Sequence, residues 1–262
     1  MKKILIVLLM VSLLLAGCAS NQETAKEENA EETAEELSAQ DYLNIAMEAM
    51  QKGDMQTAFE NIFKSADMGN PTASGLIAEA YHNGDAGTID YETALKYATI
   101  AYEGKDPKGT LYYGSIYLNG YGVEKDSEKG LQAINEAYEL GDNKAARYLG
   151  NAYLTGNGVE EDHTQAAQWF EKGVERDDYT SMIELGKLLA DGDGVEQDTK
   201  KASELFNKVA EERNDHVGAP AMYELGKLSQ AAGDIKAAEE WYQKALDNGF
   251  EDAQSALDAL KQ

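Results

Sequence analysis

The sequence has few of the residues that build disulfides, zinc sites or cationic surfaces. Its 262 residues include one cysteine and three histidines. A single cysteine cannot form an intramolecular disulfide, and so few Cys and His side chains do not supply a zinc site. Lysine and arginine total 23 against 48 aspartates and glutamates, which gives a formal net charge of −25. Nucleic-acid binding is not expected, because it needs a broad cationic face.

Sequence motifs of several enzyme classes are also missing. No serine is followed by a lysine three residues later, and the sequence contains neither G-x-S-x-G nor G-K-[ST]. The serine nucleophile motifs and the phosphate-binding loop of those classes are therefore absent. A Ser-His-Asp triad assembled only on folding stays open, with His82, His163 and His216 as its possible bases. No cofactor or metal is expected.

The chain opens with a segment typical of secreted proteins. Two lysines precede a 13-residue apolar run, Ile4–Ala16, which is too short for a comfortable membrane span. Residues 1–17 are therefore predicted to be a signal peptide. The letters L-A-G-C at its end resemble a bacterial lipobox, which implies cleavage before Cys18 and lipid attachment to its sulfur. The alternative is an ordinary signal peptide with a stray cysteine. We expect a lipid-anchored protein on the extracytoplasmic face of a bacterial membrane.

Residues 18–40 are predicted to be a disordered acidic linker after the lipidated cysteine. From residue 19 onward this segment holds seven glutamates and one lysine, and its only large apolar residue is Leu37. Such a composition cannot bury enough apolar surface to fold. The segment is interpreted as a solvated tether.

From residue 41 onward the sequence repeats with a period of 36 residues. Several residue types keep this spacing: Asp90, Asp126, Asp162 and Asp198; Gly84, Gly120, Gly156 and Gly192; Tyr81, Tyr117 and Tyr153. A fixed period of this length is typical of solenoid proteins. Each period carries two apolar stripes with helical spacing, such as Ala145, Leu149, Ala152 and then Ala166, Trp169, Phe170. The prediction is an all-α fold, an α-solenoid of about six helix-turn-helix repeats in a right-handed superhelix.

The helix ends are marked by aspartates and glycines at the same period. The predicted N-caps of the first helices are Asn70, Asp106, Asp142 and Asp178, and those of the second helices are Asp90, Asp126, Asp162, Asp198 and Asp234. The loops that begin at Gly120, Gly156 and Gly192 follow helices, so these glycines are predicted to be left-handed C-caps and not phosphate ligands. An acidic stretch at 191–196 lacks the ligand spacing of a calcium loop.

The predicted domain boundaries follow from the loop lengths. Residues 41–69 form an N-terminal hairpin with a short turn at Gly53, and residues 70–250 form the longer-looped repeats. The last hairpin again has a short turn at Gly233. Residues 251–262 are predicted to be a C-terminal capping helix, which solenoids need to shield their open end.

The repeat resembles a known family. The pattern A-x-x-x-L-G-x-x-Y-x-x-G-x-G-V-x-x-D-x-x-x-A-x-x-W-F, with Leu149, Gly150, Tyr153, Gly158, Val159 and Asp162 among its positions, is similar to the Sel-one-like repeat. That family is a longer-looped relative of the tetratricopeptide repeat. The resemblance covers about residues 41–250, and it implies an α-solenoid that serves protein–protein interaction.

The tetratricopeptide-like pattern implies that the first helices line a concave groove. The four stretches 107–119, 143–155, 179–191 and 219–231 contain five basic and three acidic residues. We expect a mildly cationic groove that binds a protein or peptide through an acidic side chain or a C-terminal carboxylate. The predicted groove residues are Lys108, Tyr112, Ser115, Lys144, Arg147, Tyr148, Asn151, Lys187 and Lys227.

The predicted function is a membrane-anchored, non-catalytic scaffold or adaptor of the bacterial cell envelope. Two alternatives are kept. The first is a hydrolase acting on cell-wall material, since such a role has been proposed for envelope proteins of this repeat class. The second is a binding module for peptidoglycan.

Overall fold

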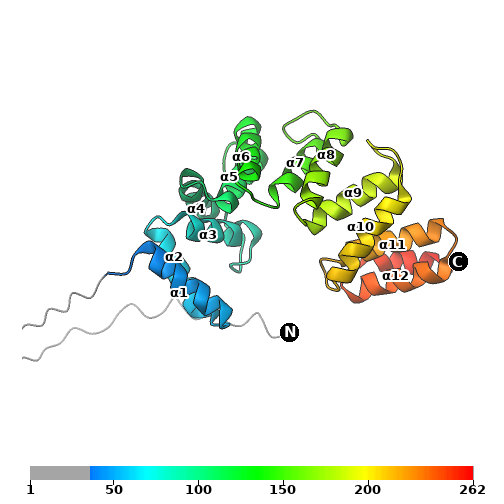
Figure 1. Ribbon diagram of the computed structural model, residues 1–262, viewed down its shortest axis with the longest axis horizontal. Helices are drawn as coiled ribbons and strands as arrows, with labels where there is room; N and C mark the ends of the chain where they lie inside the picture. The colour runs from blue at the N-terminus through cyan, green and yellow to red at the C-terminus, as the bar shows by residue number, and fades with distance from the viewer. Residues whose placement is uncertain (1–35, 262) are drawn as a thin grey trace, which may run out of the picture.

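The computed structural model describes residues 36–261, which form thirteen α-helices and no strand (Figure 1). Cys18, the signal peptide and most of the predicted linker lie outside the described residues. The helices are α1 (Ala39–Gln51), α2 (Met55–Asp67), α3 (Pro71–Asn83), α4 (Tyr91–Glu103), α5 (Pro107–Asn119), α6 (Ser127–Glu139), α7 (Ala145–Thr155), α8 (His163–Val174), α9 (Tyr179–Asp191), α10 (Thr199–Glu212), α11 (Ala219–Ala231), α12 (Ile235–Asp247) and α13 (Asp252–Ala259). None of these helices is both long enough and apolar enough to span a membrane.

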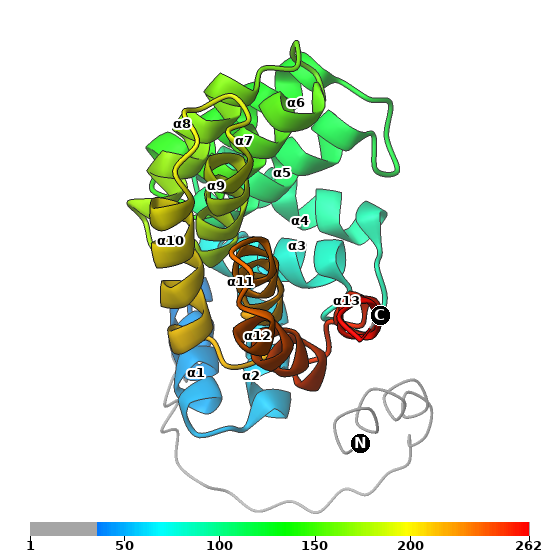
Figure 2. The same cartoon turned by 90° about the vertical axis from the view of Figure 1, so that its right-hand side faces the viewer.

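The helices pair into six consecutive hairpins, from α1–α2 to α11–α12, which follow one another along an arc (Figure 1). The predicted all-α solenoid of about six helical hairpins is confirmed. Helix α13 packs against α12 at the end of the array, as Figure 2 shows from the C-terminal side. Ala253 and Leu257 on α13 are buried against the last hairpin, while its other face is polar.

Aspartate side chains start the second helices as predicted. Each of Asp90, Asp126, Asp162, Asp198 and Asp234 accepts a hydrogen bond from the backbone N–H three residues later. Such bonds satisfy helix-terminal donors that have no partner within the helix. Asn70, Asp106 and Asp178 do the same for α3, α5 and α9.

Helix α7 departs from the prediction that Asp142 is its N-cap. The helix begins only at Ala145. The Asp142 carboxylate still accepts from the backbone N–H groups of Lys144 at 2.8 Å and Ala145 at 3.0 Å. These bonds hold a turn before the helix, so the connector from α6 is longer and α7 is shorter than its counterparts.

The structure also moves the boundary between the linker and the first hairpin. Helix α1 begins at Ala39 and is capped by Ser38, whereas the hairpin was predicted to begin at residue 41. The Asp41 N–H donates to the Ser38 hydroxyl at 3.2 Å, and the Ser38 N–H donates to the Asp41 carboxylate at 2.9 Å. This reciprocal capping box adds three residues to the folded hairpin.

The glycine loops are turns between helices, as predicted. Gly120, Gly156 and Gly192 have φ values of 70°, 65° and 72° and end the first helices. Gly158 has a φ of 83°, and a Cβ atom there would lie 2.7 Å from the Ser127 side chain of the preceding hairpin. The second glycine of this loop therefore permits close contact between successive hairpins.

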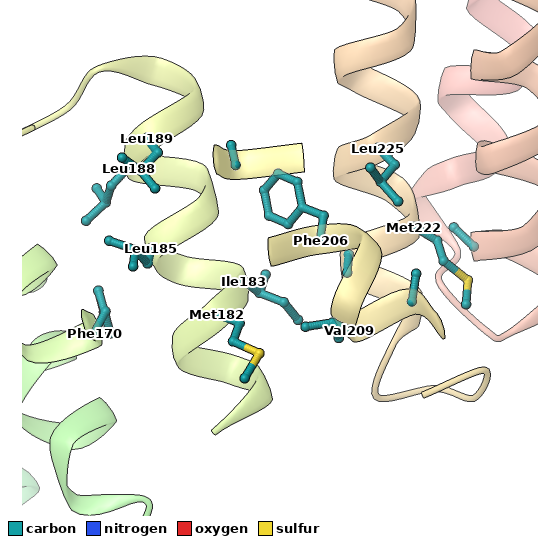
Figure 3. Packing of buried hydrophobic residues seen from close by; sticks show 14 of the residues in the cluster. Phe170, Met182, Ile183, Leu185, Leu188, Leu189, Phe206, Val209, Met222 and Leu225 are labelled. Carbon is teal, nitrogen blue, oxygen red and sulfur yellow. The ribbon is translucent and has the colours of Figure 1, made fainter. Parts of the chain in front are cut away.

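Two phenylalanines pack against glycines on the facing helix of the same hairpin. Phe170 and Phe206 are fully buried. A Cβ atom at Gly150 would lie 2.5 Å from the Phe170 ring, and one at Gly186 would lie 2.5 Å from the Phe206 ring. Figure 3 shows Phe206 among the aliphatic side chains of the C-terminal half, including Ile183 and Val209. These contacts limit how closely the two helices approach each other in the fourth and fifth hairpins.

In three of the five steps along the array, the first helices of successive hairpins contact one another. Helix α3 packs against α5, α7 against α9, and α9 against α11, whereas successive second helices make weaker contacts or none within residues 36–261. The array therefore bends toward its first helices. We call α1, α3, α5, α7, α9 and α11 the inner row.

Candidate functional site

A single carboxylate connects three hairpins on the inner row. Glu79 lies on α3, and its Oε2 atom accepts from Nζ of Lys108 on α5. Its Oε1 atom accepts from Nζ of Lys144, just before α7, at 2.7 Å, and from the hydroxyl of Tyr112 at 2.9 Å. Lys144 is 65 residues from Glu79. The bend of the array makes this contact possible.

Glu79 is ionised at neutral pH despite its position. Burial opposes ionisation, but hydrogen bonds and charge attraction from Lys108 and Lys144 outweigh it and lower the pKa of Glu79 to about 2. Burial, together with the nearby Tyr148 and Glu79, raises the pKa of Tyr112. The tyrosine therefore stays protonated and donates its hydroxyl to the carboxylate.

A histidine and a serine meet beside this carboxylate. His82 Nε2 lies 3.1 Å from Ser115 Oγ, and His82 Nδ1 lies 3.0 Å from Asn83 Oδ1. Burial lowers the pKa of His82. The connectivity is that of a Ser-His-Asn triad, but Ser115 is fully buried in the middle of α5. A substrate carbonyl has no access to its hydroxyl in this arrangement, whereas nucleophilic catalysis requires such access.

Arg147 on α7 is the least satisfied cation of the inner row. Its Nη1 atom donates to Thr180 Oγ1 at 3.1 Å, and its Nε atom lies 3.7 Å from the Asp178 carboxylate. Nε is buried and makes no hydrogen bond. The guanidinium centre lies 5.4 Å from the ring of Tyr148. A guanidinium has five donors, so Arg147 keeps unused hydrogen-bonding capacity.

The two remaining predicted cations pair with glutamates one helical turn earlier. Lys187 lies 2.6 Å from Glu184, and Lys227 lies 2.7 Å from Glu224. Each of the five predicted basic residues thus has a carboxylate within 4 Å. The inner row is therefore less cationic than its sequence count implies, because Glu79 and Asp178 lie outside the stretches counted there.

The structure also corrects two predicted groove residues. Tyr112 and Ser115 are buried and cannot contact a partner directly. Their side chains point to Glu79 and His82 instead. Asn151 is exposed and Tyr148 is half-buried on the same row.

Sequence reasoning missed Glu79, although a signal was present. Glu79 is 36 residues before Ser115 and therefore occupies the same repeat position as Ser115, Asn151 and Lys187. Glu79 lies outside the four stretches whose charges are compared above, and the GDAGTID loop that follows it departs from the repeat pattern.

The acidic loop at 191–196 makes a different contact. Asp193 lies 2.7 Å from Nδ1 of His163 at the start of the preceding second helix, and Glu161 lies 3.2 Å from Nε2. Across residues 36–261, no group of three or more His, Cys, Asp or Glu side chains could hold a metal ion.

The fold and the inner row define an α-solenoid of short helical hairpins with long glycine loops. The Sel1 repeat model matches five stretches of the chain, residues 74–106, 107–142, 143–178, 180–214 and 218–250. The chain therefore belongs to the Sel1 repeat family. Sel1 repeat proteins are generally protein–protein interaction scaffolds without catalytic activity.

Solved structures show the same architecture. The Sel1 repeat protein from Oxalobacter formigenes is 28% identical over 80% of this chain and 88% of that chain, with a TM-score of 0.67. The protein c5321, a protective antigen of uropathogenic Escherichia coli strains with an SLR fold, is 24% identical and has a TM-score of 0.53. That comparison covers 87% of this chain and 57% of the antigen, and it shows the fold alone. No curated protein matched the sequence.

Proposed function

We propose that this Sel1 repeat protein is a non-catalytic adaptor that binds a carboxylate-bearing peptide of a partner protein along the inner row. The partner carboxylate is an acidic side chain or a C-terminus. The proposal places the adaptor on the extracytoplasmic face of a bacterial membrane, anchored by lipid on Cys18.

The unused donors of Arg147 carry the proposal. The Arg147 side chain is 23% exposed, and of its Nη groups only Nη1 makes a hydrogen bond, to Thr180, so Nη2 can take an acceptor that approaches from solvent. Carboxylates match the planar fork of arginine and accept two of its hydrogen bonds at once. Exposed Asn151, one helical turn from Arg147, adds an amide that can donate to or accept from a peptide backbone.

The test compares two triple variants in cells. Photo-crosslinking probes at Asn151 identify the partner, and the same crosslink is then measured in Lys144→Ala/Arg147→Ala/Lys187→Ala. We expect this variant to lose the crosslink. The control, Lys96→Ala/Lys200→Ala/Lys236→Ala, removes the same charge from second helices and should retain it. Equal retention in both variants would contradict the proposed site.

The anchor is tested separately, because it does not depend on the inner row. Growth with an alkyne-bearing fatty acid should label the wild-type protein, and Cys18→Ser should remove the label and release the protein from the membrane fraction. Labelling that persists in Cys18→Ser would exclude this cysteine as the lipid site.

A further inference from the structure

The Glu79 carboxylate already fills a site on the inner row that is shaped for a carboxylate. Lys108 binds one of its oxygens, while Lys144 and the Tyr112 hydroxyl bind the other. The two lysines come from different hairpins and converge on one acceptor. Such divided coordination of two oxygens is the arrangement that an external carboxylate would also need.

We propose that Glu79 is an internal competitor, and that the carboxylate of a bound peptide replaces it between Lys108 and Lys144. The inference rests on the proposed function. To the carboxylate position at Arg147 it adds a second position, between Lys108 and Lys144, and the residue that opposes binding there. Glu79 then sets the affinity of the inner row instead of merely joining three hairpins.

The exposures of the three side chains permit this exchange. The side chains of Lys108 and Lys144 are 35% and 36% exposed, so a ligand can approach both amines from solvent. Glu79 is 17% exposed and belongs to a helix surface, from which a rotation of its side chain brings the carboxylate into water. The ligand carboxylate then takes over the donor of buried Tyr112, so no buried hydroxyl loses its acceptor.

Exchange of one carboxylate for another keeps the number of ion pairs constant. The wild-type site therefore gains little from binding a carboxylate, because each new charged hydrogen bond replaces an existing one. Removal of the Glu79 charge leaves two neighbouring lysines without the carboxylate that they share. A ligand carboxylate then forms charged hydrogen bonds that have no competitor. The buried Asp142 carboxylate also attracts both lysines, but it already accepts from the backbone N–H groups of Lys144 and Ala145.

The experiment measures binding of a fluorescein-labelled tetraglutamate peptide with a free C-terminus to the full-length protein by fluorescence anisotropy. Glu79→Gln removes the competing charge but keeps an amide oxygen that can accept from Tyr112. We expect Glu79→Gln to bind the peptide about tenfold more tightly than the wild type, equivalent to about 1.4 kcal/mol. Unchanged or weaker binding by a folded Glu79→Gln protein would overturn the proposal.

Glu171→Gln is the matched control. Glu171 lies on the second helix α8 and pairs with a single lysine, Lys201 on α10, so the variant changes the net charge equally and leaves the inner row unchanged. Equal tightening in both variants would indicate a general charge effect and would also overturn the proposal.

Glu79→Asp covers the case in which Glu79→Gln does not fold. It keeps the charge but is one methylene shorter, so it holds the lysines less well and should bind the peptide about threefold more tightly, or about 0.7 kcal/mol. Unchanged binding by Glu79→Asp would likewise reject the competitor role.

The outcome is separable from the test of the proposed function. Loss of the partner crosslink in the Lys144/Arg147/Lys187 variant, together with unchanged peptide binding in Glu79→Gln, rejects the competitor and retains the adaptor. Tighter peptide binding in Glu79→Gln without any partner crosslink at Asn151 retains the carboxylate site and rejects the proposed partner.

Discussion

Replacing Glu79 with glutamine is expected to destabilise the protein in a way that depends on pH. The carboxylate joins α3 to Lys108 and Lys144, so its loss removes both ion pairs that connect the second, third and fourth hairpins. Glutamine can still accept the hydrogen bond from Tyr112, so only the two charged contacts are lost.

The magnitude follows from the pKa of Glu79. The difference between an ordinary value of 4.5 and a folded-state pKa of about 2 corresponds to about 3 kcal/mol, at about 1.4 kcal/mol per pH unit. Both lysines are about one-third exposed, so solvent screens the interaction. We therefore expect Glu79→Gln to lower the free energy of unfolding by about 1–2 kcal/mol at pH 7.

Because the folded-state pKa is lowered, the stabilisation is complete above pH 4.5 and is lost as the pH falls through about 2. Urea unfolding followed by circular dichroism at pH 7, 5 and 3 measures it. The difference between wild type and Glu79→Gln should be equal at pH 7 and 5 and should fall to about half or less at pH 3. An equal difference at all three pH values would refute an electrostatic role for Glu79.

Three further outcomes test the local structure. Asp162→Ala removes the cap that accepts the Gln165 N–H at the start of α8, and urea unfolding should show a loss of about 1 kcal/mol. Gly158→Ala should cost about 2–3 kcal/mol and Gly233→Ala about 1 kcal/mol, because both glycines have positive φ but only the first would force a Cβ against Ser127; equal losses would argue against that contact. The hydrogen bond to Asp193 raises the pKa of His163 above 6.5, so this contact is present at lower pH and weakens as the pH rises through the raised value. Asp193→Asn should return the pKa of His163, measured by NMR, toward 6.5.

Local signals predicted the helices and their ends well. An aspartate that caps a helix bonds to an N–H group three residues away, and a left-handed glycine ends a helix through its own φ. Both effects depend on immediate neighbours in the chain, so the 36-residue period located them. Asp142 is the exception, because the longer connector between α6 and α7 displaces the start of the helix that it was predicted to cap.

The composition of the inner row could be predicted only in part. Its basic residues follow from the repeat position, and the structure places four of them on first helices and Lys144 directly before α7. Their acidic partners were not all found, since Glu79 belongs to a hairpin with an atypical loop and Asp178 is a cap residue outside the counted stretch. Tyr112 and Ser115 are buried because α3 packs closely against α5. These helices belong to different repeats, so the sequence of one repeat does not predict this burial.

The sequence by itself determined that this protein is a helical repeat array with aspartate caps, glycine joints and a terminal capping helix, because each of these features is specified within one or two turns of chain. Only the tertiary structure decided that Glu79 binds Lys108 and Lys144. That contact joins residues of three hairpins, and its distance depends on the curvature that accumulates from one hairpin to the next. Curvature comes from the packing of side chains between hairpins, which no single repeat encodes.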